Sequence, residues 1–316
     1  MSVYTELTHT DIASILSSYN LGTLHHFEGI AAGIENSNFF IDTEKGRFVL
    51  TIFERLDASE LPYFMRLMRH LSSKGLSCPD VMVRDDTSLL FSFMHEGVEK
   101  CGCIVSYLSG KTLDTLNEAQ LYASGKALAQ LHLAGQDFNE QRDNPTDTHW
   151  LQHMIETVSE RCEQVYGADV VLLLQDELKQ QQAYHLGSLP VGVIHGDLFV
   201  DNILFDGERV AGLIDFYYAH SAPWMMDVAI SLNAQAVILG ENDSQRMQTF
   251  LRGYSTVRNI SPQENASLSM LLRMSALRFW TSRLYDALFP REGAITQVKD
   301  PKEYENKLKF HRESSS

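Results

Sequence analysis

Hydrophobic and polar positions alternate in the first part of the chain as β-strands require. Residues 36–43 (NSNFFIDT) and 47–53 (RFVLTIF) both carry this alternation, and only the short turn EKG separates them. Such a pair predicts an antiparallel hairpin. Apolar residues then recur at helical spacing over 61–71, and Gly75 and Pro79 interrupt the pattern. The first hundred residues are therefore expected to combine strands with one amphipathic helix.

The remainder of the chain is predicted to be mainly helical. The apolar strand CIVSYL (103–108) leads into a helical segment from Glu118 to Leu133. Three short strand-like pieces interrupt the helical pattern: GVIHGD (192–197), NILFDG (202–207) and VAGLIDF (210–216). Later helices are expected over 228–237, 247–254 and 264–288. This order predicts an α+β fold of two lobes, with a strand-rich N-lobe over 1–105 and a helical C-lobe over 106–316.

The net charge of the chain limits the classes of molecule that it is expected to bind. A formal net charge of −15 and a pI near 5.2 argue against an extended surface for nucleic acid or anionic membrane. No apolar run approaches the roughly 18 residues that span a bilayer, and the N-terminus lacks a signal-peptide pattern. We expect a cytoplasmic protein with a small-molecule ligand. The four cysteines form no paired CxxC units, so reduced, partly buried thiols are favoured over a metal or redox pair.

The stretch HGDLFVDN (195–202) carries the strongest chemical signal. It places Asp197 and Asn202 five residues apart, and Asp215 follows Asp197 by eighteen residues. The two intervening strands, joined by a turn at 206–209, would return the end of the second strand to the start of the first. These three side chains are therefore expected to converge on one point.

Two acids and an amide in one cleft suit phosphoryl transfer, which depends mainly on positioning and charge. Asn202 and Asp215 offer hard oxygen ligands for Mg²⁺, and Asp197 is then available to accept the proton of a substrate hydroxyl. A purely structural role as loop caps would require neither the amide at the fifth position nor the distant acid. For Asp201, a turn residue is the favoured interpretation, and for His195 a structural hydrogen-bonding role.

A second motif, SGKT (109–112), is only half of a phosphate-binding P-loop. The full motif needs a glycine five positions before Gly110, and Val105 stands there. An ordinary turn is therefore expected around Lys111.

The catalytic stretch resembles the protein kinase core, in which an HRD loop with an asparagine five residues on precedes a metal-binding DFG. The form with Gly196 is typical of the aminoglycoside phosphotransferase and choline kinase branch. Within that branch, the chain is similar from Tyr4 to about Arg312 to bacterial homoserine kinases of the kinase-like type. The similar blocks are GIAAGIENSNFFI, FVLTIFE, LPYFMRLMRHLSSKGLSCP, GLIDFYYA, SALRFWTSRLYD and DPKEYENKLKFHR.

The resemblance implies a kinase-like fold and transfer of the γ-phosphate of ATP to the hydroxyl of L-homoserine, in threonine biosynthesis, with ATP and Mg²⁺ as cofactors. Two alternatives remain open. One is a kinase of another small alcohol, such as choline, ethanolamine or an aminoglycoside. The other is an inactive nucleotide-binding module. The sequence does not determine the oligomeric state.

The chain departs from the kinase pattern near HGDLFVDN (195–202), the predicted catalytic loop. Gly196 replaces an arginine that commonly binds a phosphorylated activation loop, and only twelve residues separate Asp215 from Asp227. We therefore expect activity without prior phosphorylation. Asp227 is interpreted as an anchor of the loop at the start of a helix.

A second departure affects the nucleotide side. FVLT aligns with the kinase VAIK strand, so Val49 would lie on the adenine side and Thr51 would replace the phosphate-binding lysine. Thr51 carries no charge. Another cation, from Lys45, Arg47 or Arg55, or a heavier reliance on Mg²⁺, would have to balance the phosphates.

Further nucleotide contacts are expected on both sides of these strands. Gly33 permits close approach of the backbone, while Ser37 and Asn38 supply short donors near the phosphates. The order of the lobes places a hinge over Ser106 to Leu108, whose backbone would meet adenine.

The sequence gives the fewest clues about the residues that bind the acceptor. A homoserine carboxylate calls for a guanidinium, and Arg278 and Arg283 lie about 140° apart on one helix, so at most one faces the site. Arg278 is favoured, although an ordinary ion pair is an open alternative for each. Tyr217 is a further candidate for substrate binding. Four aromatic residues could instead enclose a choline-like cation or belong to the core: Tyr217, Tyr218, Trp224 and Trp280.

Overall fold

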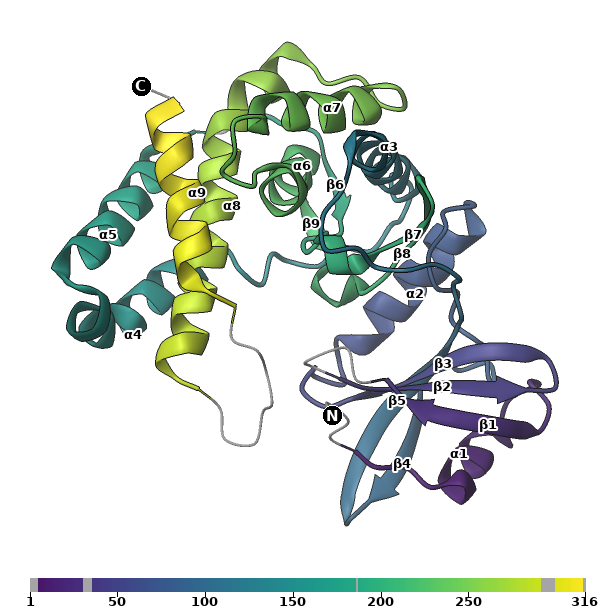
Figure 1. Ribbon diagram of the computed structural model, residues 1–316. Helices are drawn as coiled ribbons and strands as arrows, with labels where there is room; N and C mark the ends of the chain where they lie inside the picture. Colours follow the sequence, from purple (N-terminus) through teal and green to yellow (C-terminus); the bar gives the residue numbers. More distant parts are fainter. Residues whose placement is uncertain (1–4, 31–35, 186, 291–298, 315–316) are drawn as a thin grey trace. The chain divides into compact units, whose positions relative to one another are not determined.

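The chain forms two compact units, each with its own core (Figure 1). A computed structural model describes residues 5–30, 36–185, 187–290 and 299–314. The first unit runs to Ser109 and includes Gly212–Ile214, and the second contains the remaining described residues. The two-lobed α+β fold expected from the sequence is confirmed, with strands gathered in the first unit and helices in the second.

The first unit is built on an antiparallel sheet of five strands in the order β1-β2-β3-β5-β4. Its elements are α1 (His9–Leu16), β1 (Leu24–Gly29), β2 (Asn36–Thr43), β3 (Gly46–Phe53), α2 (Leu61–Ser73), β4 (Phe91–His95) and β5 (Val98–Ser106). The predicted hairpin is β2 and β3, whose register pairs Asn38 with Thr51. The predicted amphipathic helix is α2, and Gly75 follows it with φ of 84°.

Alternation divides the sheet into two faces with different chemistry. One face carries Phe39, Leu50, Ile52 and Ile104, which pack with apolar residues of α1 in a buried cluster. Because side chains alternate along a strand, Val49 and its neighbours at the same parity lie on the opposite face. The sequence pattern therefore fixes which strand residues are available to a ligand.

The second unit is mainly helical. Its principal elements are α3 (Glu118–Ala134), α4 (Thr148–Tyr166), α5 (Ala168–Ala183), β6 (Val191–Ile194), β7 (Ile203–Asp206), β8 (Arg209–Leu213), β9 (His220–Pro223), α6 (Trp224–Ser231), α7 (Asp243–Ser255), α8 (Pro262–Leu288) and α9 (Pro301–Ser314). Strands β7 and β8 form the predicted hairpin, while β6 pairs with β9. The backbone of Lys111 bridges to Phe205, as expected of an ordinary turn rather than a phosphate loop.

Two glycines allow α3 and α7 to cross closely. A Cβ atom at Gly125 would lie 2.1 Å from the carbonyl oxygen of Phe250, and one at Gly253 would lie 2.0 Å from that of Tyr122. Any larger residue would push the helices apart. This crossing fixes the position of His132 at the end of α3.

One predicted helix differs from the structure. The segment expected as a helix over 228–237 contains the end of α6 and then a π-helical turn, Leu232–Ala236. The buried Lys307 of α9 donates to the carbonyl oxygen of Asn233 (2.7 Å), and Asn233 Nδ2 donates to the carbonyl oxygen of Leu272 (2.8 Å). Tertiary contacts thus satisfy the polar groups of the widened turn, which periodicity alone does not reveal.

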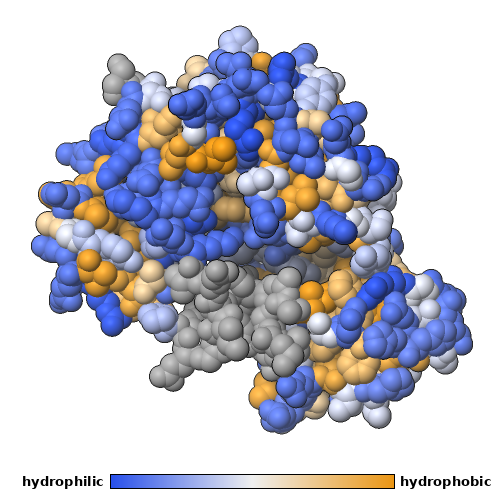
Figure 2. Space-filling view, viewed as in Figure 1, coloured by the Kyte–Doolittle hydropathy of each residue, from blue (hydrophilic) through white to orange (hydrophobic). Residues whose placement is uncertain are grey.

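The surface agrees with the acidic, polar composition. Hydrophilic residues cover most of the face seen in Figure 2. Among the described residues, no helix has the length and apolar character needed to span a membrane. The four cysteines are free thiols, and three of them are buried.

Candidate active site

The loop after β6 brings two of the three predicted polar residues into contact. Asn202 Nδ2 donates to the carbonyl oxygen of Asp197 (2.8 Å) and lies 3.4 Å from Asp197 Oδ2. A short 3₁₀ turn, Val200–Asn202, follows Phe199 and folds the loop back on itself. The five-residue spacing therefore closes the loop so that the amide and the carboxylate lie together.

Asp215 follows the β7–β8 hairpin, as the spacing predicts. The turn of this hairpin contains Gly207 with φ of 62°, and an ion pair joins Asp206 to Arg209 (3.0 Å). Asp215 itself has φ of 65° and ψ of 64°, a left-handed conformation that is uncommon for a residue with a side chain. Strain of this kind is often found at functional sites.

Asp197 lies within electrostatic range of Asp215. Burial raises the pKa of Asp197 to about 8, Asp215 contributes to the increase, and Arg278 and Lys299 oppose it. A carboxyl group with a pKa near the working pH suits a general base. The three predicted residues therefore share one electrostatic environment in the second unit.

The same residues can accommodate a magnesium ion. No cluster of three or more His, Cys, Asp or Glu side chains suited to a metal occurs in the part of the chain that the structure describes. However, Asn202 uses its amide nitrogen within the loop, which leaves Oδ1 to face a cation, and the Asp215 carboxylate is exposed. Because Mg²⁺ usually takes one or two protein oxygens and fills its other positions with phosphate and water, this donor set fits it.

Asp227 anchors the catalytic loop, as predicted from its position near a helix start. Its carboxylate accepts hydrogen bonds from the backbone N–H groups of His195 (2.7 Å) and Gly196 (3.0 Å), and it contacts His132 Nε2 (3.1 Å). Burial alone would raise the pKa of Asp227, but His132 and the His195 amide hold it below its usual value. The fully buried carboxylate is thus ionised and fixes the loop backbone.

A second layer of side chains holds His132 in place. Its Nδ1 atom lies 2.7 Å from the hydroxyl of Tyr254, and its ring stacks on Trp224 at 5.7 Å. The guanidinium of Arg258 lies 4.5 Å from the centroid of the Trp224 ring. Because the ionised Asp227 carboxylate can only accept, a neutral His132 carries its proton on Nε2, and its Nδ1 accepts from the Tyr254 hydroxyl.

Gly196 is required by both conformation and space. Its φ of 77° favours glycine, and a Cβ atom there would lie 2.7 Å from the carbonyl oxygen of Tyr218. The structure therefore leaves no room for the arginine of the kinase pattern. The segment after Asp215 instead packs directly against the loop, with the ring of Phe216 4.8 Å from that of His195.

Arg278 and Arg283 face different surroundings, as their angular separation on α8 predicts. Arg278 Nη1 donates to the carbonyl oxygen of Gly196 (2.8 Å). Arg283 donates to the carbonyl oxygen of Asp300 (3.1 Å) and pairs with Glu303 (2.6 Å). Arg278 therefore lies at the catalytic loop, whereas Arg283 holds α9.

The two tryptophans among the candidate aromatic residues pack against other side chains of the protein. Trp280 is fully buried in the core of the second unit, and Trp224 stacks on His132. Tyr218 lies near the guanidinium of Arg278, with 5.9 Å between the group and the ring centroid. Tyr217 is half-buried in the turn Phe216–Tyr218, and its role in substrate binding stays a prediction.

The predicted nucleotide residues of β2 and β3 lie on two faces of the sheet. Thr51 Oγ1 donates to Asn38 Oδ1 (2.8 Å), and Val49 shares their face by parity. Ser37 points to the other face, where its Oγ accepts from the Thr5 N–H (2.9 Å) and donates to Glu54 (2.6 Å). Gly33 lies outside the described residues.

The predicted hinge follows the end of β5. Ser106 Oγ accepts a hydrogen bond from the Asp80 N–H (2.9 Å), and the Ser106 N–H donates to the Asp80 carbonyl oxygen (2.8 Å). A Cβ atom at Gly212 would lie 2.6 Å from Leu108 Cδ1, so Leu108 packs closely on that glycine. Both hinge residues are therefore held within the first unit.

Cations near Thr51 are engaged in other contacts. Lys45 Nζ donates to Asn20 Oδ1 (2.6 Å), and Arg47 pairs with Glu28 while its guanidinium lies 4.4 Å from the Phe40 ring. Sequence reasoning missed the pair of Lys100 with Glu54 (2.7 Å). By parity with Ile104, Lys100 lies on the face opposite Thr51, so it does not replace the absent lysine.

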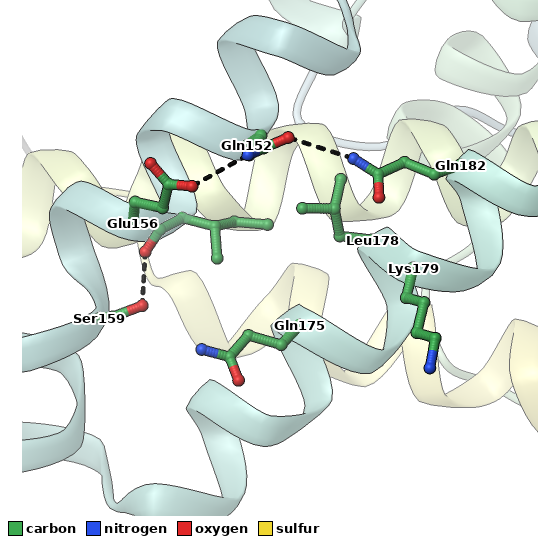
Figure 3. A pocket seen from close by; sticks show the side chains of 8 residues that line it. Gln152, Glu156, Ser159, Gln175, Leu178, Lys179 and Gln182 are labelled. Atoms are coloured by element: carbon green, nitrogen blue, oxygen red, sulfur yellow. Dashed lines mark hydrogen bonds between the residues drawn. The ribbon is translucent and has the colours of Figure 1, made fainter.

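A surface pocket of about 260 Å³ lies elsewhere, between α4 and α5 (Figure 3). Gln152 contributes an amide that bonds to Glu156 (3.0 Å) and accepts from Gln182 (3.3 Å). None of the predicted site residues lines this pocket. The catalytic loop is therefore the better candidate for chemistry.

Comparison with known proteins identifies the family of the chain. Residues 26–261 match the phosphotransferase enzyme family. The chain is 39% identical over 322 residues to a homoserine kinase of Rhizobium etli, covering 100% of this chain and 98% of that one. It is 40% identical over 315 residues to a homoserine kinase of Beijerinckia indica, covering 99% and 96% of the two chains.

Solved structures share the fold at lower identity. An amicoumacin kinase in complex with AMP-PNP and Ca²⁺ superposes with a TM-score of 0.71 at 17% identity, covering 98% of this chain and 93% of that one. A microcompartment-associated aminopropanol kinase gives 0.66 at 16% identity, with 97% and 95% covered. The fold, the catalytic loop and the full-length relatives together show that this chain belongs to the phosphotransferase enzyme family.

Proposed function

We propose that the chain transfers the γ-phosphate of ATP to the side-chain hydroxyl of L-homoserine, giving O-phospho-L-homoserine for threonine biosynthesis. The full-length relatives at 39–40% identity are homoserine kinases, which supports this acceptor. The activity would be cytoplasmic, where ATP and amino-acid precursors are available. The single observation that carries the chemistry is the closed loop in which Asn202 contacts Asp197 beside Asp215.

Each polar residue of the loop has a distinct role in this proposal. Asp197 accepts the proton of the homoserine hydroxyl as that oxygen attacks the γ-phosphorus. Asp227 keeps the loop backbone in position through two N–H groups, so that the base does not move away from the acceptor. Gly196 lets the segment after Asp215 approach the loop.

Asn202 Oδ1 and the Asp215 carboxylate would hold Mg²⁺, which when bound neutralises charge on the nucleotide phosphates. Asp215 is exposed and its left-handed backbone directs the residue out of the preceding strand. Without a lysine at Thr51, the Mg²⁺ held by these two residues would carry a larger share of the charge balance.

The nucleotide is proposed to contact the sheet unit. Asn38, Val49 and Thr51 share one sheet face, which supports contact with adenine and phosphates. Gly33 and the backbone of Ser37 are proposed to flank the phosphates, since the Ser37 hydroxyl is bonded on the other sheet face, and the backbone of Ser106 and Leu108 is proposed to meet adenine.

The acceptor is proposed to bind beside Arg278. This guanidinium uses one N–H for the Gly196 carbonyl, and its remaining donors suit a carboxylate. Tyr217 is proposed as a further contact. Because Arg278 and Lys299 both act electrostatically on Asp197, a cationic acceptor such as choline would meet repulsion here.

Steady-state turnover of ATP by the purified chain tests the proposal. We expect phosphorylation of L-homoserine in the presence of Mg²⁺, and much lower rates with L-serine, choline and kanamycin. No prior phosphorylation of the protein should be needed. A clear preference for choline or kanamycin, or no turnover of any acceptor, would contradict the proposed function.

A further inference from the structure

A second cation lies at the catalytic loop, and the sequence analysis did not single it out. Lys299 Nζ is 3.3 Å from Asp201 Oδ2 and 5.0 Å from the ring centroid of Phe199. Both partners of the ion pair are well exposed, at 49% and 62% of their side-chain surface. Exposed pairs of this kind contribute little to stability, so the ammonium can exchange its partner at low cost.

Three aromatic rings fix the surroundings of this cation. Phe199 contacts Phe279 edge-to-face with 4.9 Å between ring centroids, and Phe279 lies 5.4 Å from Tyr304. These rings come from the catalytic loop, α8 and α9. Arg278 lies 4.5 Å over Phe279, while Lys299 lies over the neighbouring Phe199. Phe279 and Phe199 therefore each carry one cation, while Tyr304 carries Arg283 and Lys307.

The backbone next to Lys299 is also held firmly. Arg283 donates to the carbonyl oxygen of Asp300 and to the carboxylate of Glu303, the third residue of α9. Glu303 accepts in turn from the buried Lys307 (2.6 Å). Lys299 precedes this anchored segment by one residue, so its side chain starts from a defined position.

Arg278 and Lys299 both lie in the C-terminal part of the sequence, which the family match does not cover. The match to the phosphotransferase family ends at residue 261, whereas the homoserine kinase relatives cover essentially the whole chain. Arg278 and Lys299 both follow that point. Since members of one kinase family share phosphate chemistry and differ in their acceptors, this region is where acceptor recognition is expected.

We propose that Lys299 is a specificity-determining residue that binds the carboxylate of the amino-acid acceptor, together with Arg278. The inference rests on the proposed function. In the absence of acceptor the ammonium pairs with Asp201, and a bound carboxylate replaces that partner. Both cations lie within electrostatic range of Asp197, which places the recognised carboxylate near the proposed base.

The experiment compares two acceptors that differ only in the carboxylate, L-homoserine and 3-aminopropan-1-ol. Variants K299M and K299R are measured beside K309M, a control on α9 whose side chain is 48% exposed and pairs with Glu305. For K299M we expect KM for homoserine to rise about 10- to 100-fold with kcat little changed, as for loss of a hydrogen bond between charged groups. K299R should restore part of the affinity.

The same substitution should not weaken turnover of 3-aminopropan-1-ol, because that acceptor has no carboxylate to lose and its ammonium group meets less repulsion once Lys299 is removed. K309M should behave as wild type with both acceptors. A variant D201N, which removes the competing partner, should leave KM for homoserine equal to or below the wild-type value.

Three outcomes separate the possible errors. If K299M keeps the wild-type preference for homoserine over 3-aminopropan-1-ol, the assignment of Lys299 is wrong while the proposed function stands. Equal losses with both acceptors would indicate a structural role and would also overturn the assignment. If the wild-type chain does not phosphorylate homoserine, the proposed function fails, and the inference about Lys299 fails with it.

Discussion

Polar side chains have different kinds of partner in the sheet of the first unit and in the catalytic loop of the second. On the sheet face of Val49, Thr51 bonds to the neutral Asn38, and the charged Arg47 pairs with Asp42 and Glu28. At the loop, two carboxylates approach one another at Asp197 and Asp215, and the buried carboxylate of Asp227 orders the backbone.

This difference indicates that the sheet positions a ligand, whereas the catalytic loop takes part in making and breaking a bond. Around Thr51, where the bonded side chains are neutral, the sheet can support a nucleotide through shape and backbone groups, and it loses little when one hydroxyl is removed. In a loop whose charged side chains interact, structure and activity depend on every one of them, because removing one leaves an unpaired buried charge, which is costly. Substitutions in the two regions should therefore differ by orders of magnitude in their effects.

The largest effect is expected from Asp197→Asn. An amide cannot accept the hydroxyl proton, so kcat should fall by about 100- to 10,000-fold while KM for ATP changes little. Steady-state kinetics with homoserine measures this effect, and Asp206→Asn in the exposed hairpin turn is a suitable control. Activity within a few-fold of wild type would show that another group is the base.

Asp227→Asn should affect both activity and stability. An amide can no longer accept hydrogen bonds on two oxygens from the loop N–H groups and His132, so the free energy of unfolding should fall by about 3 kcal/mol. We expect kcat to fall roughly 100-fold in the molecules that remain folded, because the loop loses its anchor. Denaturant unfolding and kinetics check both effects, and an unchanged unfolding midpoint would refute the anchoring role.

Gly196→Ala should destabilise the protein by about 2 kcal/mol or more, because alanine is strained at positive φ and its Cβ would clash with the Tyr218 carbonyl. Gly207→Ala is the matched control: φ there is 62°, but nothing lies within 4 Å of the added atom. The control should lose less stability and keep its activity. Equal losses in both variants would assign the effect to backbone strain alone.

The pH dependence of stability should show the raised pKa of Asp197. The folded protein keeps a proton on this group up to about pH 8, whereas the unfolded chain releases it near pH 4, so folding binds a proton in that range. This contribution to stability is complete below about pH 4 and is lost as pH rises through about 8. Asp197→Asn should therefore reduce the decline of Tm between pH 5 and 8, and an identical decline in both proteins would contradict the raised pKa.

The smallest effect is expected from Thr51→Val. This change removes one hydrogen bond to Asn38 and should cost about 1 kcal/mol of stability. Because no charge is lost, KM for ATP should change less than about threefold, and Thr51→Ser should behave as wild type. A loss of ATP affinity comparable to that on removal of a kinase lysine would show that this hydroxyl has a larger role than one hydrogen bond between neutral groups suggests.

Much of the local structure could be predicted because it depends on neighbours in the sequence. Alternation over 36–53 identifies the hairpin, and helical spacing identifies α2 and α3. The spacing of eighteen positions from Asp197 to Asp215 predicts their approach, because a hairpin returns the chain to its starting point. The helix predicted over 228–237 was wrong in its second half, since contacts from α8 and α9 stabilise a π turn there.

The sequence by itself determined the secondary structure pattern, the two-lobed α+β class and the chemical identity of the loop, because these depend on periodicity and short spacings. Only the tertiary structure decided which distant groups complete the site. Asp227 contacts His132 across 95 residues, Arg278 reaches Gly196 across 82, and Lys299 reaches Asp201 across 98. No local pattern encodes such pairs, since their separation in the chain carries no information about distance until helices α3, α6, α8 and α9 have packed.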